Sequence, residues 1–285
     1  MAAHAQPTTR RPRRSLSAIP KHGLLLVFVL VTLVPIYFMV VNSFKSQAEY
    51  LTNPYGLPSD PTLGTIGDAF RGGDLLRWLG NSALFSVASV TLSTIVAALA
   101  AYPISLLRWR PGPWLLGILV ALMVVPPIVL VIPLFKMMVD LGQLNNYHSV
   151  IIVYTGILLP FSTFLLASFF RTTPRDFLEA ARLDGAGHVR IWWSIVLPLA
   201  LPAVVTVAIV QALWVWNEVL IAVVFLQSEQ LRTLMVGLTI FQGRYDLNVP
   251  LVMAGMVWAT VPMLLLYLVG QRFFVRGLTA GAVKG

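Results

Sequence analysis

The chain has 285 residues, of which 58% are hydrophobic and only 11% are charged. Soluble domains carry about 25% charged residues, and disordered or fibrous proteins need a polar or repetitive composition, so the composition favours a polytopic α-helical membrane protein. The net charge of +9 is interpreted as orientation charge beside membrane spans, and no nucleic-acid ligand is expected. The absence of cysteine excludes disulfides, a thiolate nucleophile and a cysteine-based metal site.

Six apolar stretches are long enough to cross about 30 Å of hydrocarbon as α-helices. They lie at residues 22–42, 79–107, 114–138, 147–170, 196–226 and 251–274. The first is longer than a signal-peptide core and no convincing cleavage site follows it, so a retained anchor helix is predicted. We therefore expect an all-α fold with a basic disordered tail over 1–21, one membrane domain over 22–274 and a second tail over 275–285.

The distribution of arginine and lysine predicts the orientation of the chain. Most of these residues lie in the alternate segments 1–21, 107–113, 171–195 and 271–285. Positive residues accumulate on the cytoplasmic side of membrane proteins, so both termini of this multi-pass protein are predicted to be cytoplasmic. Residues 43–78 then form the largest outer loop, with a short amphipathic helix near Thr65–Phe70.

The predicted cytoplasmic segment at 171–195 has the pattern of a helix, a turn and a second helix. Thr173 as N-cap and Pro174 as first helical residue predict the start of the first helix, Gly185 predicts its end, and a second helix is expected over 188–196. The first helix presents a face formed by Phe177, Ala180, Ala181 and Asp184. Two interpretations follow from these residues alone: an amphipathic pair in the lipid headgroup region, or a docking surface for a soluble partner.

The same segment resembles the EAA loop of ABC importer permeases, with every spacing kept. The matching positions are Glu179, Ala180, Ala181, Gly185, Ile195, Leu197 and Pro198. The resemblance implies a type I importer fold in which the loop over 174–198 carries a coupling helix that sits in a cleft of an ATPase subunit. Glu179 would face a basic group of the ATPase, while the small residues, with Asp184 beside them, permit close packing.

Two further segments resemble carbohydrate permeases of the maltose type. They are the C-terminal residues 273–285 and the triplet Trp216-Asn217-Glu218, so the resemblance covers about 20–285. It implies a subunit of a prokaryotic inner-membrane importer that moves a sugar or oligosaccharide by alternating access. The implied partners are a second homologous permease, two ATPase subunits that bind ATP and Mg, an extracytoplasmic binding protein and membrane lipid.

No motif for catalysis is present in the chain. A phosphate-binding loop requires G-x-x-x-x-G-K-[ST], and the nearest match, Lys45-Ser46, has Phe44 in place of a glycine. The H-E-x-x-H and G-x-S-x-G patterns are also missing, and the four histidines are scattered. We therefore predict that this chain is not an enzyme, that it binds no metal or cofactor itself and that a partner hydrolyses ATP.

Glu218 is the most costly residue in the predicted spans, because a carboxylate at membrane depth must face protein or water. Gln211, Trp214 and Glu218 are spaced to share one helical face, and Asn217 lies beside them. Aromatic faces and polar acceptors suit sugar rings, so these four residues are predicted to line the substrate path. A polar clamp between this helix and a partner permease is the structural alternative.

Prolines interrupt the predicted spans, as hinges or as static kinks. They are Pro126, Pro127, Pro133, Pro160, Pro198, Pro202 and Pro262.

Two rival functions stay open. Because the EAA loop is shared among importers, the solute could be a glycerol phosphate, a polyamine or an anion. An ion-coupled secondary carrier is the other rival, although it usually needs more ionisable groups in its spans than Glu218.

Overall fold

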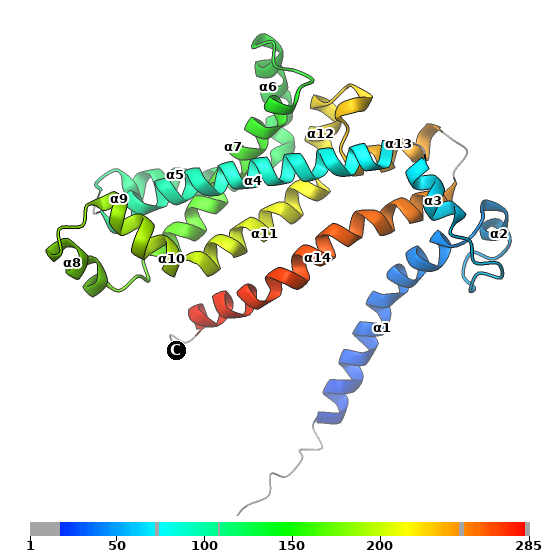
Figure 1. The fold of residues 1–285 in the computed structure, drawn as a ribbon, viewed down its shortest axis with the longest axis horizontal. Coiled ribbons are helices and arrows are strands. Elements are labelled where there is room, and N and C mark those ends of the chain that lie inside the picture. The colour runs from blue at the N-terminus through cyan, green and yellow to red at the C-terminus, as the bar shows by residue number, and fades with distance from the viewer. Residues whose placement is uncertain (1–17, 72–73, 108, 245–247, 283–285) are drawn as a thin grey trace, which may run out of the picture.

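The computed structural model describes residues 18–71, 74–107, 109–244 and 248–282, and all regular elements in these ranges are helices (Figure 1). The longer helices are α1 (Ala18–Ser43), α4 (Asp74–Leu106), α5 (Gly112–Leu122), α6 (Pro127–Asp140), α7 (Tyr147–Phe170), α11 (Leu201–Asn217), α13 (Leu234–Arg244) and α14 (Val249–Ala282). The shorter ones are α2 (Gln47–Thr52), α3 (Gly64–Arg71), α8 (Arg175–Leu183), α9 (His188–Ile191), the π-helical turn η1 (Trp192–Val196), α10 (Leu197–Leu199), α12 (Leu220–Phe225) and the 3₁₀ turn η2 (Glu229–Leu231).

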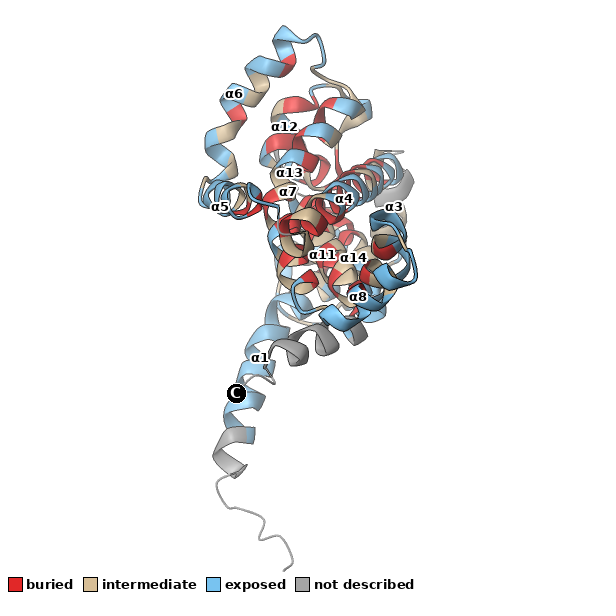
Figure 2. Ribbon diagram, turned by 90° about the vertical axis from the view of Figure 1, so that its left-hand side faces the viewer, coloured by how far each residue is buried: buried red, intermediate tan, exposed pale blue. Residues whose placement is uncertain are grey.

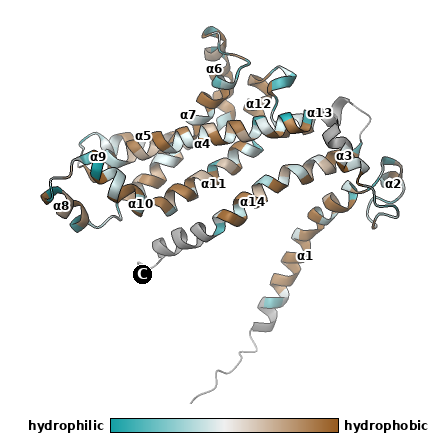
Figure 3. Ribbon diagram, viewed as in Figure 1, coloured by the Kyte–Doolittle hydropathy of each residue, from teal (hydrophilic) through white to brown (hydrophobic). Residues whose placement is uncertain are grey.

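Four helices in the described ranges are long and apolar enough to cross a membrane. These segments are His22–Ser43, Asp74–Leu106, Tyr147–Phe170 and Val249–Gln271. Two bent pairs raise the number to six if each pair is one span: α5 with α6, and His188–Leu199 with α11. Figure 3 shows that hydrophobic residues dominate these helices, as expected where lipid replaces water around the bundle.

The third predicted span, 114–138, for which a hinge or a kink was expected at its prolines, is bent far more sharply than a kink. It is broken into α5 and α6, whose axes differ by 100°. A residue that precedes a proline is pushed out of the α region, and Pro126, which precedes Pro127, has an extended ψ of 134°. By contrast, Pro160 and Pro262 lie inside the unbroken helices α7 and α14, where the bundle tolerates a missing backbone donor.

The fifth predicted span, 196–226, is also wrong as a single helix. A bend of 71° separates the segment that ends at Leu199 from α11, and Pro202 lies in the first turn of α11. At the other end, Glu218 is extended, with φ −73° and ψ 127°, before α12 begins. Glu218 therefore lies in a gap between two helices and not within one.

Helix ends elsewhere follow the local signals, with small shifts. Pro174 is the N-cap of α8 and not its first helical residue, because its ψ of 131° is extended. Helix α3 confirms the amphipathic helix near Thr65–Phe70. Helix α1 begins at Ala18, within the range predicted as tail, and α14 continues without a break through 275–282. The remaining residues of the predicted tails, 1–17 and 283–285, lie outside the described residues.

The core runs along α4, which packs against α7 and α11 (Figure 2). Small residues on one face of α4 allow the close approach, and they include Ser82, Ser86, Ser89, Ser93 and Ala97. Helix α14 packs between α11 and α1, whereas α1 itself exposes almost all of its apolar surface. Helices α8, α9 and α10 gather at one end of the long helices, and α2 and α3 lie at the other (Figure 1).

Candidate functional site

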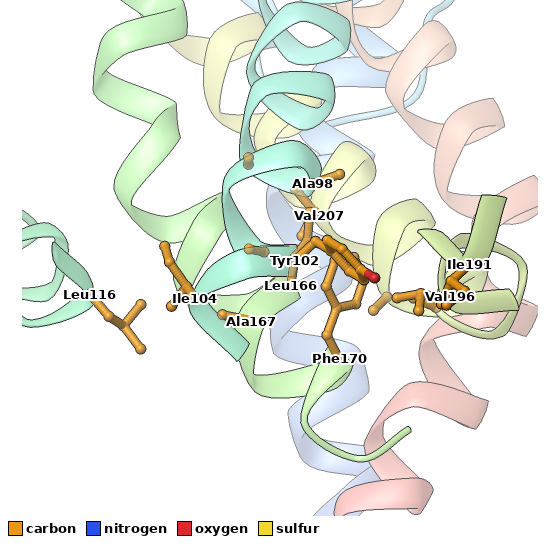
Figure 4. Close-up of a cluster of buried hydrophobic side chains, with 14 of the residues drawn as sticks. Ala98, Tyr102, Ile104, Leu116, Leu166, Ala167, Phe170, Ile191, Val196 and Val207 are labelled. Atoms are coloured by element: carbon orange, nitrogen blue, oxygen red, sulfur yellow. The ribbon is translucent and has the colours of Figure 1, made fainter. Parts of the chain in front are cut away.

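The segment over 174–198 is held to the bundle by a buried apolar seat (Figure 4). Leu178, Ile191 and Val196 belong to the same buried cluster as Tyr102 of α4 and Phe170 of α7. Burying side chains of this size stabilises an arrangement by about 1.5–3 kcal/mol each. The segment is therefore expected to move together with α4 and α7.

Two hydrogen bonds reinforce this seat. The Tyr102 hydroxyl lies 3.3 Å from Nδ1 of His188, and Nε1 of Trp192 donates to the backbone oxygen of Ala98 over 3.3 Å. Both join the second half of the loop to α4. The contact of His188 could not be predicted from the sequence, because its partner on α4 lies 86 residues earlier in the chain and no local pattern indicates the pair.

Helix α8 presents its small residues outward. Ala180 and Asp184 are exposed, Ala181 is half-buried and Phe177 on the same side is 56% exposed. Gly185 ends the helix with a φ of +77°, a conformation that glycine adopts without strain. A surface about two helical turns long is thus open to a partner, while Leu178 is buried in the bundle.

The remaining motif residues lie on the return arm of the loop. Ile195 and Leu197 are half-buried and Pro198 is exposed, while Val196 between them is fully buried. Glu179 is exposed on α8, next to the arginines of its own helix. The motif therefore places Ala180, Asp184 and Gly185 on the outward side of α8 and Glu179 on the side that carries Arg175 and Arg182. The Ile-x-Leu-Pro part lies where the loop rejoins the membrane helices.

The Glu218 carboxylate is held in the gap between α11 and α12. It accepts hydrogen bonds from the backbone N–H groups of Ile221 (2.8 Å) and Ala222 (3.1 Å), which are orphan donors at the start of α12. It also accepts one from the Tyr154 hydroxyl of α7 at 2.6 Å. These three donors explain how a carboxylate is accommodated here, and the two backbone bonds explain why the helix is interrupted.

The other predicted path residues divide into two groups. Trp214 packs edge-on against Tyr154 with ring centroids 5.9 Å apart, and together with Gln211 it lines a cavity of about 580 Å³ between α5, α6, α7 and α11. Asn217 is exposed and its amide donates back to Leu213 of its own helix. Of the predicted path residues, Gln211 and Trp214 therefore line this cavity, whereas Asn217 does not.

Gln211 also contributes to the packing of α11 against α7. Its side chain is 2% exposed, and Nε2 donates to the backbone oxygen of Leu158 at 2.9 Å and to the hydroxyl of Ser162. Ser162 in turn lies 3.3 Å from Ser93 of α4. This polar chain joins three helices of the same chain, whereas the structural alternative was a clamp to a partner permease.

The outer-loop segment before α4 is compact. The buried ammonium of Lys45 donates to the backbone oxygen of Asn53 over 2.7 Å. Glu49 accepts a hydrogen bond from the backbone N–H of Ser59, which lowers the pKa of the Glu49 carboxyl.

In the described residues no group of histidine, aspartate and glutamate side chains is arranged to hold a metal ion.

Known proteins resemble this chain over most of its length. The family model described as "Binding-protein-dependent transport system inner membrane component" matches residues 93–278. The melibiose/raffinose/stachyose import permease protein MelC of Bacillus subtilis is 33% identical over 88% of this chain and 91% of its own. The trehalose/maltose transport system permease protein MalG of Thermococcus litoralis is 34% identical over 91% and 94%.

A solved structure agrees with these relatives. One chain of a bacterial ABC transporter involved in the import of the acidic polysaccharide alginate matches with a TM-score of 0.79 and 28% identity, covering 94% of this chain and 100% of that one. The fold and the apolar helices together define a multi-pass α-helical membrane protein. The chain belongs to the family of inner membrane components of binding-protein-dependent transport systems.

Family membership decides several of the sequence-based predictions. The all-α fold of an ABC importer permease is confirmed. The chain is a membrane transport subunit and not an enzyme. The ion-coupled secondary carrier is set aside, since the family works with binding proteins.

Proposed function

We propose that this chain is the permease subunit of an ATP-driven importer, that it has six spans with both termini in the cytoplasm, and that its solute is a sugar or oligosaccharide. Its partners in this proposal are a second permease, two ATPase subunits that bind ATP and Mg, and an extracytoplasmic binding protein. The observation that carries the proposal is the seating of the 174–198 loop, whose α8 is exposed on one side and anchored to α4 and α7 on the other.

The loop is suited to transmit a push into the membrane helices. When the ATPase dimer closes, a cleft around the exposed side of α8 moves the helix. Leu178, Ile191 and Val196 carry that motion to α4 and α7, because close-packed apolar contacts transmit strain. The hydrogen bonds from His188 and Trp192 make α4 move together with the loop. The bundle then alternates between an inward-facing and an outward-facing state.

The proposed substrate path runs past Trp214 and Glu218. Trp214 offers an aromatic edge at the 580 Å³ cavity, and the Glu218 gap supplies polar groups at membrane depth, a combination that suits a ring with apolar faces and a hydroxylated rim. The sugar import of MelC and MalG supports this class of solute. Uptake of a labelled oligosaccharide, compared with glycerol phosphate, a polyamine and an inorganic anion, tests it.

The coupling role is tested with the assembled transporter in liposomes, by measuring uptake and ATP hydrolysis together. In Gly185→Trp, an indole occupies the turn after α8, where an added Cβ meets no neighbour within the chain. We expect uptake to fall at least about ten-fold while ATP hydrolysis continues, since a cleft built for small residues rejects the ring.

Two further variants separate the causes. Gly185→Ala has the same backbone strain at φ +77° without the bulk, and it should retain most of the uptake. Gly23→Trp adds the same ring in open space on α1 and should transport like the wild type. Full uptake by Gly185→Trp would contradict the coupling role of the loop.

A further inference from the structure

A large cavity opens at the α8 end of the bundle, on the side of α8 opposite its exposed small residues. Its volume is about 1520 Å³, and it is bounded by the end of α4, the connection to α5, the end of α7 and one face of α8. Arg175, Glu179 and Arg182, which are about one turn apart on α8, line it. The transport role proposed above uses Leu178 and His188 at the border of this cavity, but it assigns no ligand to the cavity itself.

The lining of the cavity is strongly basic. Arg110 enters it from the α4–α5 connection, Arg171 from the end of α7, and Arg175 and Arg182 from α8, against the single carboxylate of Glu179. None of the four arginines lies within 4 Å of a carboxylate in the described part of the chain. Four guanidinium groups around one hollow attract an anion with several acceptor oxygens, and arginine binds phosphate through two parallel hydrogen bonds.

A shallow apolar hollow adjoins the cavity on the outside of α5 and is called the groove below. Pro113 lines both features, and the groove, of about 430 Å³, is completed by Trp114, Gly117, Ile118 and Ala121. Pro113, Gly117 and Ala121 repeat every four residues, so they form a stripe about 12 Å long on one side of the helix. Trp114 is 80% exposed beside the stripe, in the position of an interfacial tryptophan.

We propose that the cavity and the groove together bind one anionic phospholipid of the leaflet at the α8 end. The phosphate and the anionic headgroup occupy the basic cavity, and one acyl chain lies along the stripe of α5. A free phosphate or sugar phosphate would use the cavity alone, and the adjoining apolar groove, which shares Pro113 with the cavity, is the observation that favours a lipid. Because Arg175 and Arg182 lie on α8 and Arg110 and Arg171 on the bundle, the headgroup contacts both parts.

The test is a titration of the purified full-length chain with its co-purifying subunits, after delipidation, followed by native mass spectrometry. The probes are phosphatidylglycerol and phosphatidylcholine with identical acyl chains. We expect phosphatidylglycerol to bind at least ten-fold more tightly. An arginine near a membrane surface contributes a factor of about five, so Arg110→Gln with Arg171→Gln should weaken phosphatidylglycerol binding by about 30-fold, and each single change by about five-fold.

Matched variants separate the lipid site from general charge and from packing. Arg190→Gln removes an exposed arginine of α9 that does not line the cavity and should leave the affinity unchanged. Gly117→Phe places a ring in the groove at a position where an added Cβ meets no neighbour, and it should weaken binding several-fold. Gly80→Phe, at another open position, should have no effect.

Four results would overturn the proposal. Equal affinity for the two lipids, or no loss in the double arginine variant, would remove the headgroup site. Displacement of phosphatidylglycerol by millimolar inorganic phosphate would identify a free-anion site. Loss of the second permease in Gly117→Phe, with lipid affinity kept, would show that a protein surface covers the groove.

Discussion

Two breaks in the predicted spans, one between α5 and α6 and the other between α11 and α12, have different causes. The break between α5 and α6 is imposed by the covalent backbone of Pro126 and Pro127, and no side chain caps the start of α6. The break between α11 and α12 depends on one carboxylate, Glu218, which accepts two backbone hydrogen bonds and one from Tyr154 of α7. The cause of the first break thus lies in the local backbone, whereas the second depends on a neighbouring helix and can respond when that helix moves.

The largest expected effect comes from removing the carboxylate. Glu218→Ala leaves the Tyr154 hydroxyl and two N–H groups of α12 without acceptors, which costs about 3 kcal/mol of unfolding free energy. Thermal unfolding of the purified chain in detergent measures the loss. Asp140→Asn, an exposed carboxylate at the end of α6, is the control and should change stability by less than about 0.5 kcal/mol.

A double-mutant cycle with Tyr154→Phe then isolates the contact between helices. Tyr154→Phe removes only the hydroxyl and keeps the ring beside Trp214; a hydrogen bond to a charged group contributes about 1.5–3 kcal/mol. If the effects of Glu218→Ala and Tyr154→Phe simply add, the gap does not depend on α7 and the contrast between the two breaks is lost.

The proline break yields the next prediction. In the double variant Pro126→Ala with Pro127→Ala, the backbone constraint is absent and α5 can continue into α6, so we expect the fixed 100° bend to become a broad distribution. The chain has no cysteine, and spin labels can therefore be attached at Ile118→Cys and Val139→Cys alone. A single narrow distance unchanged from the wild type would show that packing, and not the prolines, sets the bend.

How far the sequence predicts this molecule depends on the range of the cause. Helices α4 and α7 were predicted closely, since long apolar stretches require nothing beyond the segment itself, and the end of α8 follows from Gly185. The Glu218 gap was missed because its cause includes Tyr154, 64 residues away. The Pro126-Pro127 pair was noticed, but a kink was expected where the structure has a bend of 100°.

The candidate site divides in the same way. The exposed side of α8 follows from local spacing, so the EAA pattern was sufficient to locate it. The apolar seat that anchors α8 depends on the contacts of His188 with Tyr102 and of Trp192 with Ala98. The partners are more than 80 residues apart in the sequence, and no periodic pattern predicts such pairs. In the same way, Gln211 was predicted on the substrate path, but its amide also binds α7.

The smallest expected effect concerns Glu49, an exposed carboxylate that serves as a comparison for the hydrogen-bonded carboxylate of Glu218. Glu49 also accepts a backbone N–H, that of Ser59, but at an exposed position where the bond lowers the pKa of the carboxyl. A lowered pKa means that the charged form is favoured in the folded loop. Its stabilisation is therefore present above the unfolded glutamate pKa of about 4.3 and lost as the pH falls through the lower folded value.

Hydrogen exchange at the Ser59 amide measures this effect. Protection in the wild type should fall between pH 5 and pH 3 after correction for intrinsic exchange, and Glu49→Gln should have weak protection that does not change over that range. Water competes for the exposed carboxylate, so global unfolding should not change measurably in Glu49→Gln. If Glu49→Gln lowered global stability as much as Glu218→Ala, the location of Glu218 between α7 and α12 would add nothing to the stability that its hydrogen bonds contribute. The gap at Glu218 would then not differ from an ordinary loop contact.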